Sequence, residues 1–242
     1  MEAETKQKIQ WALIAAFVLA SLRTGYIFYR RHEDRLEEQK QALARQVGYS
    51  NEDYYVNPKK LHPYDLKSAR AALTAQPEWV QLGYAHAYFP VVGKSADFGK
   101  SAGSLGPLEK LQVTDVIEAR APGAPDPQVL AVFEKDGKHF AVPIGTKSND
   151  EYHIYSDDIF FIQDPHELYK HWPPEIWQAV DHHEVKPGMN ELQTAFAIGL
   201  GVPDDGATSY EKTVRYPNDG KPLVVVFRSG KVAEVSPGTS SS

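Results

Sequence analysis

The residues best suited to chemistry in this sequence are the two histidines of His166-Glu167-x-x-x-His171. Imidazoles close to a carboxylate are the groups that hold and use a catalytic zinc ion. The zinc-protease signature places its histidines four residues apart, so that both lie on one face of a helix. Here they are five residues apart, and Pro165 and Pro173 stand on either side. We therefore interpret this segment as a linker with exposed imidazoles.

A second polar cluster is Asp181-His182-His183-Glu184. Neighbouring side chains on a helix point about 100° apart, so these four are not expected to converge on one ion. Histidines near the C-terminal end of a helix also interact favourably with its dipole. The cluster is interpreted as a polar helix end without a metal, and a weak surface metal site is the alternative.

Two acidic pairs, Asp157-Asp158 and Asp204-Asp205, fall where turns are expected. Neither is flanked by the alternating acids and terminal glutamate of a calcium loop. The sequence also has no phosphate-binding glycine loop and no Gly-x-Ser-x-Gly nucleophile. We expect no catalytic residue, no cofactor and no small-molecule substrate. The alternative is a hydrolase built from His166, His171, Asp157 and Asp158.

The overall composition excludes several classes of function. The chain has 242 residues, no cysteine and a formal net charge of -6. Without cysteine there is no thiolate catalysis, no disulfide and no lipid-accepting N-terminal cysteine. A negative chain without a basic patch is not expected to bind nucleic acid. With 17 glycines and 17 prolines, many turns and short strands are expected.

Residues 9–29 are the candidate membrane-spanning segment. They are largely apolar, with Arg23 as the one charged residue, and are long enough to cross a hydrocarbon core of ~30 Å. We interpret residues 1–31 as a retained single-pass anchor. The alternative is a cleaved secretory signal, with Lys6 and Lys8 before a short apolar run.

The orientation of this anchor is less clearly marked than its position. Two lysines precede the span, whereas four arginines lie within it or follow it: Arg23, Arg30, Arg31 and Arg35. Positive charge favours the cytoplasmic side, so this count alone places the C-terminal part in the cytoplasm. A family resemblance in the C-terminal region, described below, implies the opposite orientation.

Residues 32–77 are predicted to form a helical stalk and then a linker. Within them Asp65 is expected to cap a short helix that runs to Leu73 and ends before Pro77. The stretch 79–92 is aromatic-rich without a clear period. Its aromatic residues are more consistent with a core than with a contact surface: Trp79, Tyr84, Tyr88 and Phe89. Residues 93–106 are expected to be a flexible loop.

Residues 78–165 are predicted to form a small antiparallel β barrel, because short strands follow one another closely. They are expected at residues 108–120, 129–133, 139–144, 152–155 and 159–162. Asp136-Gly137 between the second and third predicts a hairpin whose turn needs positive φ at both central residues. The spacing resembles the Src-homology type of barrel, or the barrel of photosynthetic reaction-centre H subunits. Such barrels have many unrelated functions, so the resemblance implies a recognition scaffold more than an activity.

Residues 166–235 are predicted to form two helices followed by three antiparallel strands. Pro173 and Pro174 begin the first helix. Asn190 should cap the second, with Gln193 completing a capping box, and Gly201 should end it. Strands are expected at residues 212–216, 223–227 and 232–235, with the two helices covering one face. Residues 236–242 are predicted to be a disordered tail.

This C-terminal region resembles the SmpA/OmlA (BamE-like) domain of bacterial envelope proteins. The resemblance rests on Val185, Gly188-Met189, Leu200-Gly201-x-Pro203, Tyr216, Phe227 and Gly230-Lys231-Val232, with Trp177-x-Ala179-Val180 as a first helix. Members of that family are mostly small non-enzymatic envelope proteins, which implies an extracytoplasmic location. The chain departs from the family in its anchor, its β-rich middle and its lack of a lipid-accepting cysteine. The family's role in outer-membrane assembly is therefore not transferred.

Together these observations predict an α+β chain with a single N-terminal transmembrane helix, a small barrel and a two-helix, three-strand module. The expected function is non-enzymatic scaffolding or assembly, through binding of another protein, in the inner membrane with the soluble part in the periplasm. The alternative is a cytoplasm-facing accessory subunit of a membrane complex.

Overall fold

The computed structural model describes residues 53–93, 95–204, 206–208 and 210–238. All of them belong to one compact unit, Val47–Ser242. The predicted anchor and the part of the stalk before residue 53 lie outside the described residues. Among the residues that are described, no helix is both long and apolar enough to cross a membrane.

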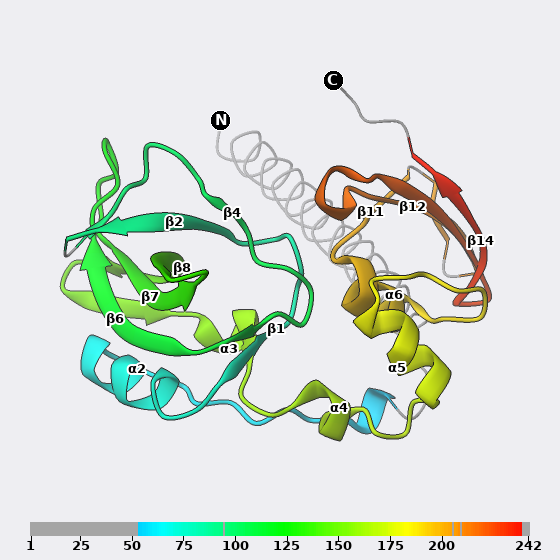
Figure 1. Ribbon diagram of the computed structural model, residues 1–242, viewed down its shortest axis with the longest axis horizontal. Coiled ribbons are helices and arrows are strands. Elements are labelled where there is room, and N and C mark those ends of the chain that lie inside the picture. Colours follow the sequence, from blue (N-terminus) through cyan, green and yellow to red (C-terminus); the bar gives the residue numbers. More distant parts are fainter. Residues whose placement is uncertain (1–52, 94, 205, 209, 239–242) are drawn as a thin grey trace, which may run out of the picture. The chain divides into compact units, whose positions relative to one another are not determined.

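The described chain is α+β, with short helices and antiparallel sheets, as the sequence predicts (Figure 1). The largest sheet has seven strands. Its members are β2 (Ala87–Val92), β3 (Ser95–Ala96), β4 (Gly103–Ser104), β6 (Val113–Ala119), β7 (Gln128–Lys135), β8 (Lys138–Ser148) and β9 (Glu151–Ile154). The central path runs β3-β2-β8-β7-β6, with β4 beside β2 and β9 beside β8.

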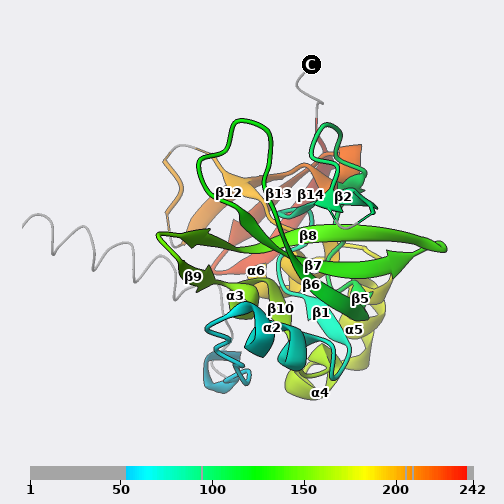
Figure 2. The same cartoon turned by 90° about the vertical axis from the view of Figure 1, so that its left-hand side faces the viewer.

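The β7–β8 hairpin forms the middle of this sheet (Figure 2). Its turn residues Asp136 and Gly137 have φ of 53° and 71°. Both values are positive, as a two-residue hairpin turn requires, so the predicted hairpin is confirmed. The strands on either side are longer than predicted because cross-strand pairing extends from Lys135↔Lys138 to Gln128↔Thr146.

The predicted closure into a barrel was wrong. Within the described residues, the end strands β3 and β6 are not paired with each other, although Ala96 and Ala119 share a buried cluster. The stretch 108–120 is divided at Gln112 into β5 (Lys110–Leu111) and β6. Because β5 pairs with β1 (Glu78–Val80), strands that a barrel would need are used in a second sheet.

This second, three-stranded sheet has the order β10-β1-β5, where β10 is Phe160–Phe161. Successive side chains of a strand point to opposite faces of a sheet. Phe160 accordingly packs in the core of the N-terminal part, whereas Phe161 packs in the core of the C-terminal part. Val80 and Trp79 of β1 divide in the same way. The small sheet therefore has one face in each core.

Helix α2 (Leu66–Leu73) contacts β6 and contributes Ala69 and Leu73 to the N-terminal core (Figure 2). Asp65 accepts a hydrogen bond from the backbone N–H of Ser68, and the Ser68 hydroxyl oxygen accepts one from Asp65 N–H. This reciprocal capping box confirms the predicted start of the helix. Thr74 ends it, three residues before Pro77.

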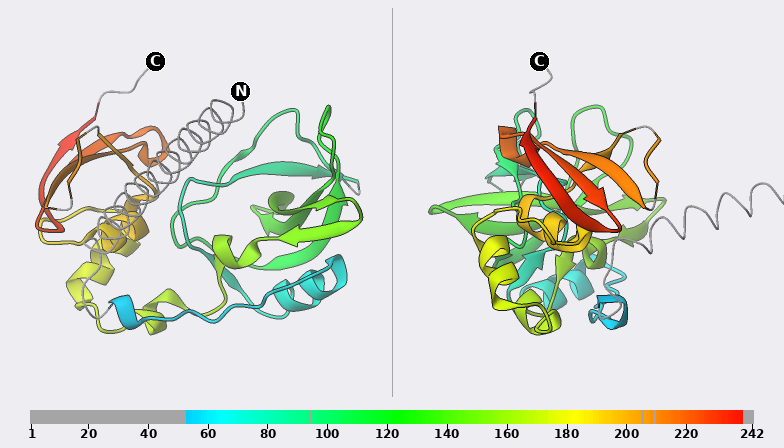
Figure 3. Two further views of the ribbon diagram at one scale, coloured as in Figure 1. Left: turned by 180° about the vertical axis from the view of Figure 1, so that it is seen from behind. Right: turned by 90° about the vertical axis from the view of Figure 1, so that its right-hand side faces the viewer.

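The C-terminal part has the predicted order of two helices followed by antiparallel strands (Figure 3). Helices α5 (Pro174–Asp181) and α6 (Glu191–Ile198) follow the short helices α3 (Ser156–Ile159) and α4 (Pro165–Leu168). The sheet is β11 (Val202–Pro203), β12 (Glu211–Tyr216), β13 (Leu223–Arg228) and β14 (Lys231–Pro237), in that order. Strand β11 was not predicted, and β14 extends into the stretch 236–237 predicted to be disordered.

One face of this sheet is covered by the two helices (Figures 1 and 3). Val214, Val225, Phe227 and Val232 from three strands pack with Trp177 and Phe196 from the helices. The space beneath the helices is therefore filled by a hydrophobic core. Short 3-10 turns complete the described chain: η1 (Asp53–Tyr55) and η2 (Asn218–Gly220).

The predicted start of α6 is confirmed and its predicted end is wrong. Asn190 accepts a hydrogen bond from Gln193 N–H at 2.8 Å, and the Gln193 side chain accepts one from Asn190 N–H at 2.8 Å. The helix ends at Gly199, whose φ is 81°, rather than at Gly201. A Cβ on Gly199 would lie 2.6 Å from Gly83 O, so close backbone approach selects glycine there.

Candidate functional site

A carboxylate that the sequence interpretation missed, Asp53, joins distant parts of the chain. Its side chain is fully buried. Oδ1 lies 2.7 Å from His171 Nε2 and accepts a hydrogen bond from Trp172 Nε1 at 2.6 Å. Oδ2 accepts one from Asn190 Nδ2 at 2.7 Å. One carboxylate therefore connects η1, the segment after α4 and the N-terminus of α6.

The position and orientation of the His171 side chain are explained largely by its contact with the Asp53 carboxylate. Its side chain is 24% exposed, and the contact with Asp53 orients the ring at the edge of the C-terminal core. A histidine–carboxylate pair becomes catalytic when a nucleophile, a metal or an activated water lies beside it. In the part of the chain that the structure describes, no group of three or more His, Asp or Glu residues is arranged to hold a metal.

His166 lies in a different environment. Its ring stacks on Trp177, with centroids 4.0 Å apart and planes at 24°. Nδ1 lies 3.2 Å from Asp164 Oδ1, and Nε2 lies 3.1 Å from Asp181 Oδ1. Both ring nitrogens thus face carboxylates of this chain, which makes His166 a link between α4 and α5.

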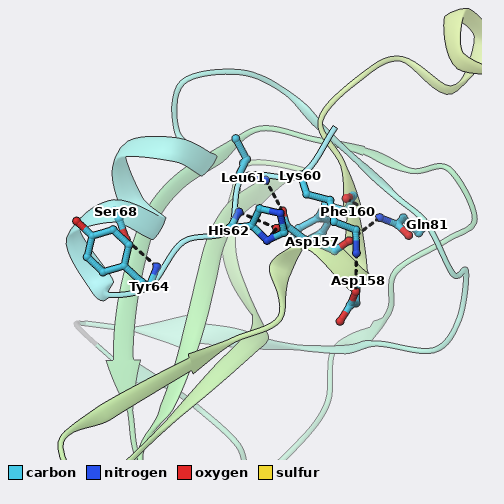
Figure 4. A network of polar contacts seen from close by, with 9 residues as sticks. All are labelled: Lys60, Leu61, His62, Tyr64, Ser68, Gln81, Asp157, Asp158 and Phe160. Atoms are coloured by element: carbon cyan, nitrogen blue, oxygen red, sulfur yellow. Dashed lines mark hydrogen bonds and ion pairs between the residues drawn. The ribbon is translucent and has the colours of Figure 1, made fainter. Parts of the chain in front are cut away.

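Asp157 and Asp158 belong to a third group of contacts (Figure 4). Asp157 accepts hydrogen bonds from the backbone N–H groups of Leu61 and His62, at 2.9 and 2.7 Å. Asp158 is exposed and pairs with Lys60 at 3.4 Å. The four residues of the hydrolase alternative therefore contact separate partners and do not form one constellation.

The polar cluster at the end of α5 is also divided among separate contacts. Asp181 faces His166, and His183 Nδ1 donates to the carbonyl oxygen of Ala197 at 2.9 Å. Glu184 lies 3.8 Å from Lys186 Nζ. Of the turn acids, Asp204 accepts two hydrogen bonds from the guanidinium of Arg215, at 2.7 and 2.9 Å.

A cavity of about 340 Å³ lies beside His166 and is also lined by Trp79, Glu109, Asp181 and His183. Its acidic side chains already have partners. Glu109 binds Lys135 Nζ at 2.6 Å and accepts from Gly106 N–H at 2.8 Å. Asp181 faces His166. This pairing favours a structural role for the polar lining over binding of a charged ligand.

The aromatic residues of the stretch 79–92 are mostly core, as interpreted from the sequence. Tyr88 is 8% exposed and makes edge contacts with Phe133 and Phe140. Trp79 packs against the C-terminal core, with Lys110 Nζ 5.0 Å from its ring centroid. Phe89 packs in a smaller cluster with Phe98.

Glu78 is the second residue that the sequence interpretation missed. Its side chain is fully buried, and neither carboxyl oxygen has a hydrogen-bond partner among the described residues. Burial, with a smaller contribution from the negative charge of Asp157, raises the pKa of Glu78 to about 8. Glutamate is rarely buried without a partner. The sequence therefore suggests an exposed position for Glu78, which is why its burial was not predicted.

Exposed apolar side chains occur on two segments that contact each other through the backbone, the β11 edge and the segment after β1. Leu82, Leu200 and Val202 are 36%, 44% and 65% exposed. Their two segments are joined by a hydrogen bond of 3.2 Å from Leu200 N–H to Gly83 O. We call these three residues the β11 patch.

Comparison with protein-family models, with curated proteins and with solved structures gave no match for this chain.

Proposed function

We propose that this chain is a non-enzymatic, membrane-anchored envelope protein that binds another protein through the β11 patch. The observation that carries the proposal is the exposure of Leu82, Leu200 and Val202 on joined segments. Apolar side chains grouped on an otherwise polar surface are typical of protein contact sites. The partner that fits is an apolar segment of a second envelope protein.

The C-terminal architecture supports the same proposal. Two helices followed by antiparallel strands are the order that a BamE-like module would have, and members of that family are mostly not enzymes. The residues that a hydrolase would need contact separate partners, which gives that alternative no support. The anchor at residues 1–31 remains a prediction from hydropathy.

Contact through the patch can be tested by photocrosslinking in intact cells. A benzophenone amino acid is placed at Val202, and at Glu175, an exposed residue of α5, as the matched control. We expect one adduct of defined mass from position 202, weakened by Leu200→Asp, and none from position 175. Equal adducts from both positions, or adducts of lipid size alone, would overturn the proposal.

The side of the membrane is tested separately, because four arginines in and after the predicted span favour the cytoplasm. Phosphatase and fluorescent-protein fusions at the C-terminus distinguish the two orientations. Phosphatase activity supports the envelope location. Fluorescence without phosphatase activity supports the alternative, a cytoplasm-facing accessory subunit that uses the same patch.

A further inference from the structure

Residues 59–62, which we call the strap, lead into α2 and are held by the α3–β10 region through polar contacts (Figure 4). Lys59 N–H donates to Gln163 Oε1 at 2.9 Å. Leu61 N–H and His62 N–H donate to the two oxygens of Asp157. The Leu61 side chain packs against the N-terminal core. The strap therefore lies against that core, and the Asp157 carboxylate binds it there.

The Asp157 carboxylate is itself held in place. Its side chain is 12% exposed. Its backbone carbonyl oxygen accepts a hydrogen bond from Gln81 Nε2 at 3.0 Å, and the same amide donates to Phe160 O at 2.7 Å. Gln81 directly follows β1, so the clamp on the strap is connected to the strand that carries Glu78.

Glu78 lies on the face of β1 that is turned to the N-terminal core, the same core against which Leu61 of the strap packs. Residues two apart in a strand share a face, so Glu78 points to the side of Val80, which is part of the N-terminal core. Leu111, opposite Glu78 in β5, is in that core too. A fully buried carboxyl group without a partner is compatible with this apolar setting when it is neutral. A carboxylate in this setting would need solvation.

We propose that the strap is a proton-linked closure: it is shut over neutral Glu78 and opens as Glu78 loses its proton. Two effects act together. Ionised Glu78 is poorly solvated in the closed core, and its charge repels the Asp157 carboxylate that holds the strap. Opening lets water reach Glu78 and releases Leu61 from the core surface.

Other charged groups on the elements packed near Glu78 have partners of their own. Arg70 of α2 binds Asp115 at 2.5 Å, and Lys110 of β5 lies over the Trp79 ring. In the strap, Lys60 pairs with Asp158. His62 also contacts the clamp, because its Nδ1 lies 3.5 Å from Asp157 Oδ2. The experiment must therefore separate Glu78 from His62.

The pH window follows from linkage. Glu78 has a pKa of about 8 when the strap is closed and approaches its ordinary value of 4.5 when water reaches it. Between these values the closed form holds a proton that the open form has lost. The opening equilibrium constant therefore rises with pH by up to about tenfold per unit in this window. Above a pH of about 8 the opening equilibrium constant becomes independent of pH, because Glu78 is then ionised in both forms.

Hydrogen exchange on the full-length chain reports this opening directly, because the N–H groups of Leu61 and His62 are the ones that Asp157 binds. Exchange rates are measured between pH 5 and 9 and corrected for the intrinsic pH dependence. We expect protection of these two amides to fall at least tenfold from pH 5 to 8 and then to level off. Glu78→Gln should give a profile flat to within about twofold, because glutamine does not titrate.

His62→Gln is the matched control and should keep most of the pH dependence. The proposal is overturned if wild-type protection is constant across the window, if Glu78→Gln keeps the wild-type slope, or if His62→Gln removes it. Near-UV circular dichroism checks that each variant is folded.

A second measurement needs no change at Glu78. The chain has no cysteine, so Lys60→Cys provides a single site for a nitroxide label, with Glu175→Cys as the control. The label at position 60 should become more mobile from pH 5 to 8, whereas the label at position 175 should not change. Identical profiles at the two positions would overturn the proposal.

Discussion

The buried carboxylate of Asp53 accepts a hydrogen bond of 2.7 Å from the side-chain amide of Asn190, although 137 residues separate them in the sequence. Asn190 also caps α6 through its amide oxygen. A single side chain thus starts a helix and fixes the segment that precedes the strap. Both uses depend on an amide, which can donate and accept at the same time.

Removing the Asp53 carboxylate should destabilise the chain strongly. In Asp53→Ala the donors of His171, Trp172 and Asn190 lose their acceptor, and Trp172 and Asn190 are buried. We expect the free energy of unfolding to fall by roughly 2–4 kcal/mol in urea titrations. Asp53→Asn keeps one oxygen and should cost less. Equal stability of Asp53→Ala and the wild type would contradict the role of Asp53.

Asn190→Asp distinguishes capping from the contact with Asp53. Aspartate is as good an N-cap as asparagine, so a residue that only caps should tolerate the change. Here the new carboxylate would face Asp53, and we expect a loss of about 2 kcal/mol or more. The double variant Asp53→Asn with Asn190→Asp should recover part of this loss. A double-mutant cycle without coupling would show that the two residues act independently.

Gly199→Ala should be costly for two reasons. Its φ of 81° disfavours a side chain, and a Cβ would lie 2.6 Å from the Gly83 carbonyl oxygen. We expect a loss of about 2 kcal/mol or more, measured by thermal or urea unfolding. Gly188 is the matched control, because its φ is also positive but no atom lies within 4 Å of the added carbon. Gly188→Ala should cost about 1 kcal/mol.

The global stability should depend on Glu78 across the acid and neutral range. The folded chain raises the pKa of this acid from 4.5 to about 8, so the native state keeps a proton that the unfolded state releases between these values. The free energy of unfolding therefore falls as pH rises through this window, and the contribution is constant above it. Relative to the wild type, Glu78→Gln should gain roughly 3–5 kcal/mol between pH 5 and 8.

Urea unfolding of both chains at several pH values measures that difference. The exposed Glu175→Gln variant is the control and should run parallel to the wild type. Parallel curves for Glu78→Gln and the wild type would show that Glu78 does not hold its proton in the folded chain.

Features with a local cause were predictable from the sequence. The starts of α2 and α6 could be predicted because Asp65 and Asn190 each have their capping partner three residues further on. The β7–β8 turn was predictable because Asp136-Gly137 suits positive φ at both positions. In each case the interacting atoms are close in the sequence.

Features that depend on contacts between distant segments were not predictable. Strand β1 has three residues, one of them the buried Glu78, and β2 contains Pro90, so neither has the usual pattern of a strand. The end of α6 at Gly199 is selected by the backbone of Gly83. The same holds for the candidate sites, because the contacts of Asp53 and Asp157 join residues about a hundred positions apart.

The Asp53–Asn190 contact also constrains when the chain can complete its structure during synthesis. The segment around Asp53 follows the predicted anchor, yet its partner is translated 137 residues later. At about 5–20 residues per second this delay is on the order of ten seconds. All buried residues of the N-terminal core, from Ala69 to Phe160, are synthesised before Asn190. Docking of the Asp53 segment is therefore among the late steps of folding, because it has to wait for Asn190, whereas the residues of the N-terminal core are available earlier.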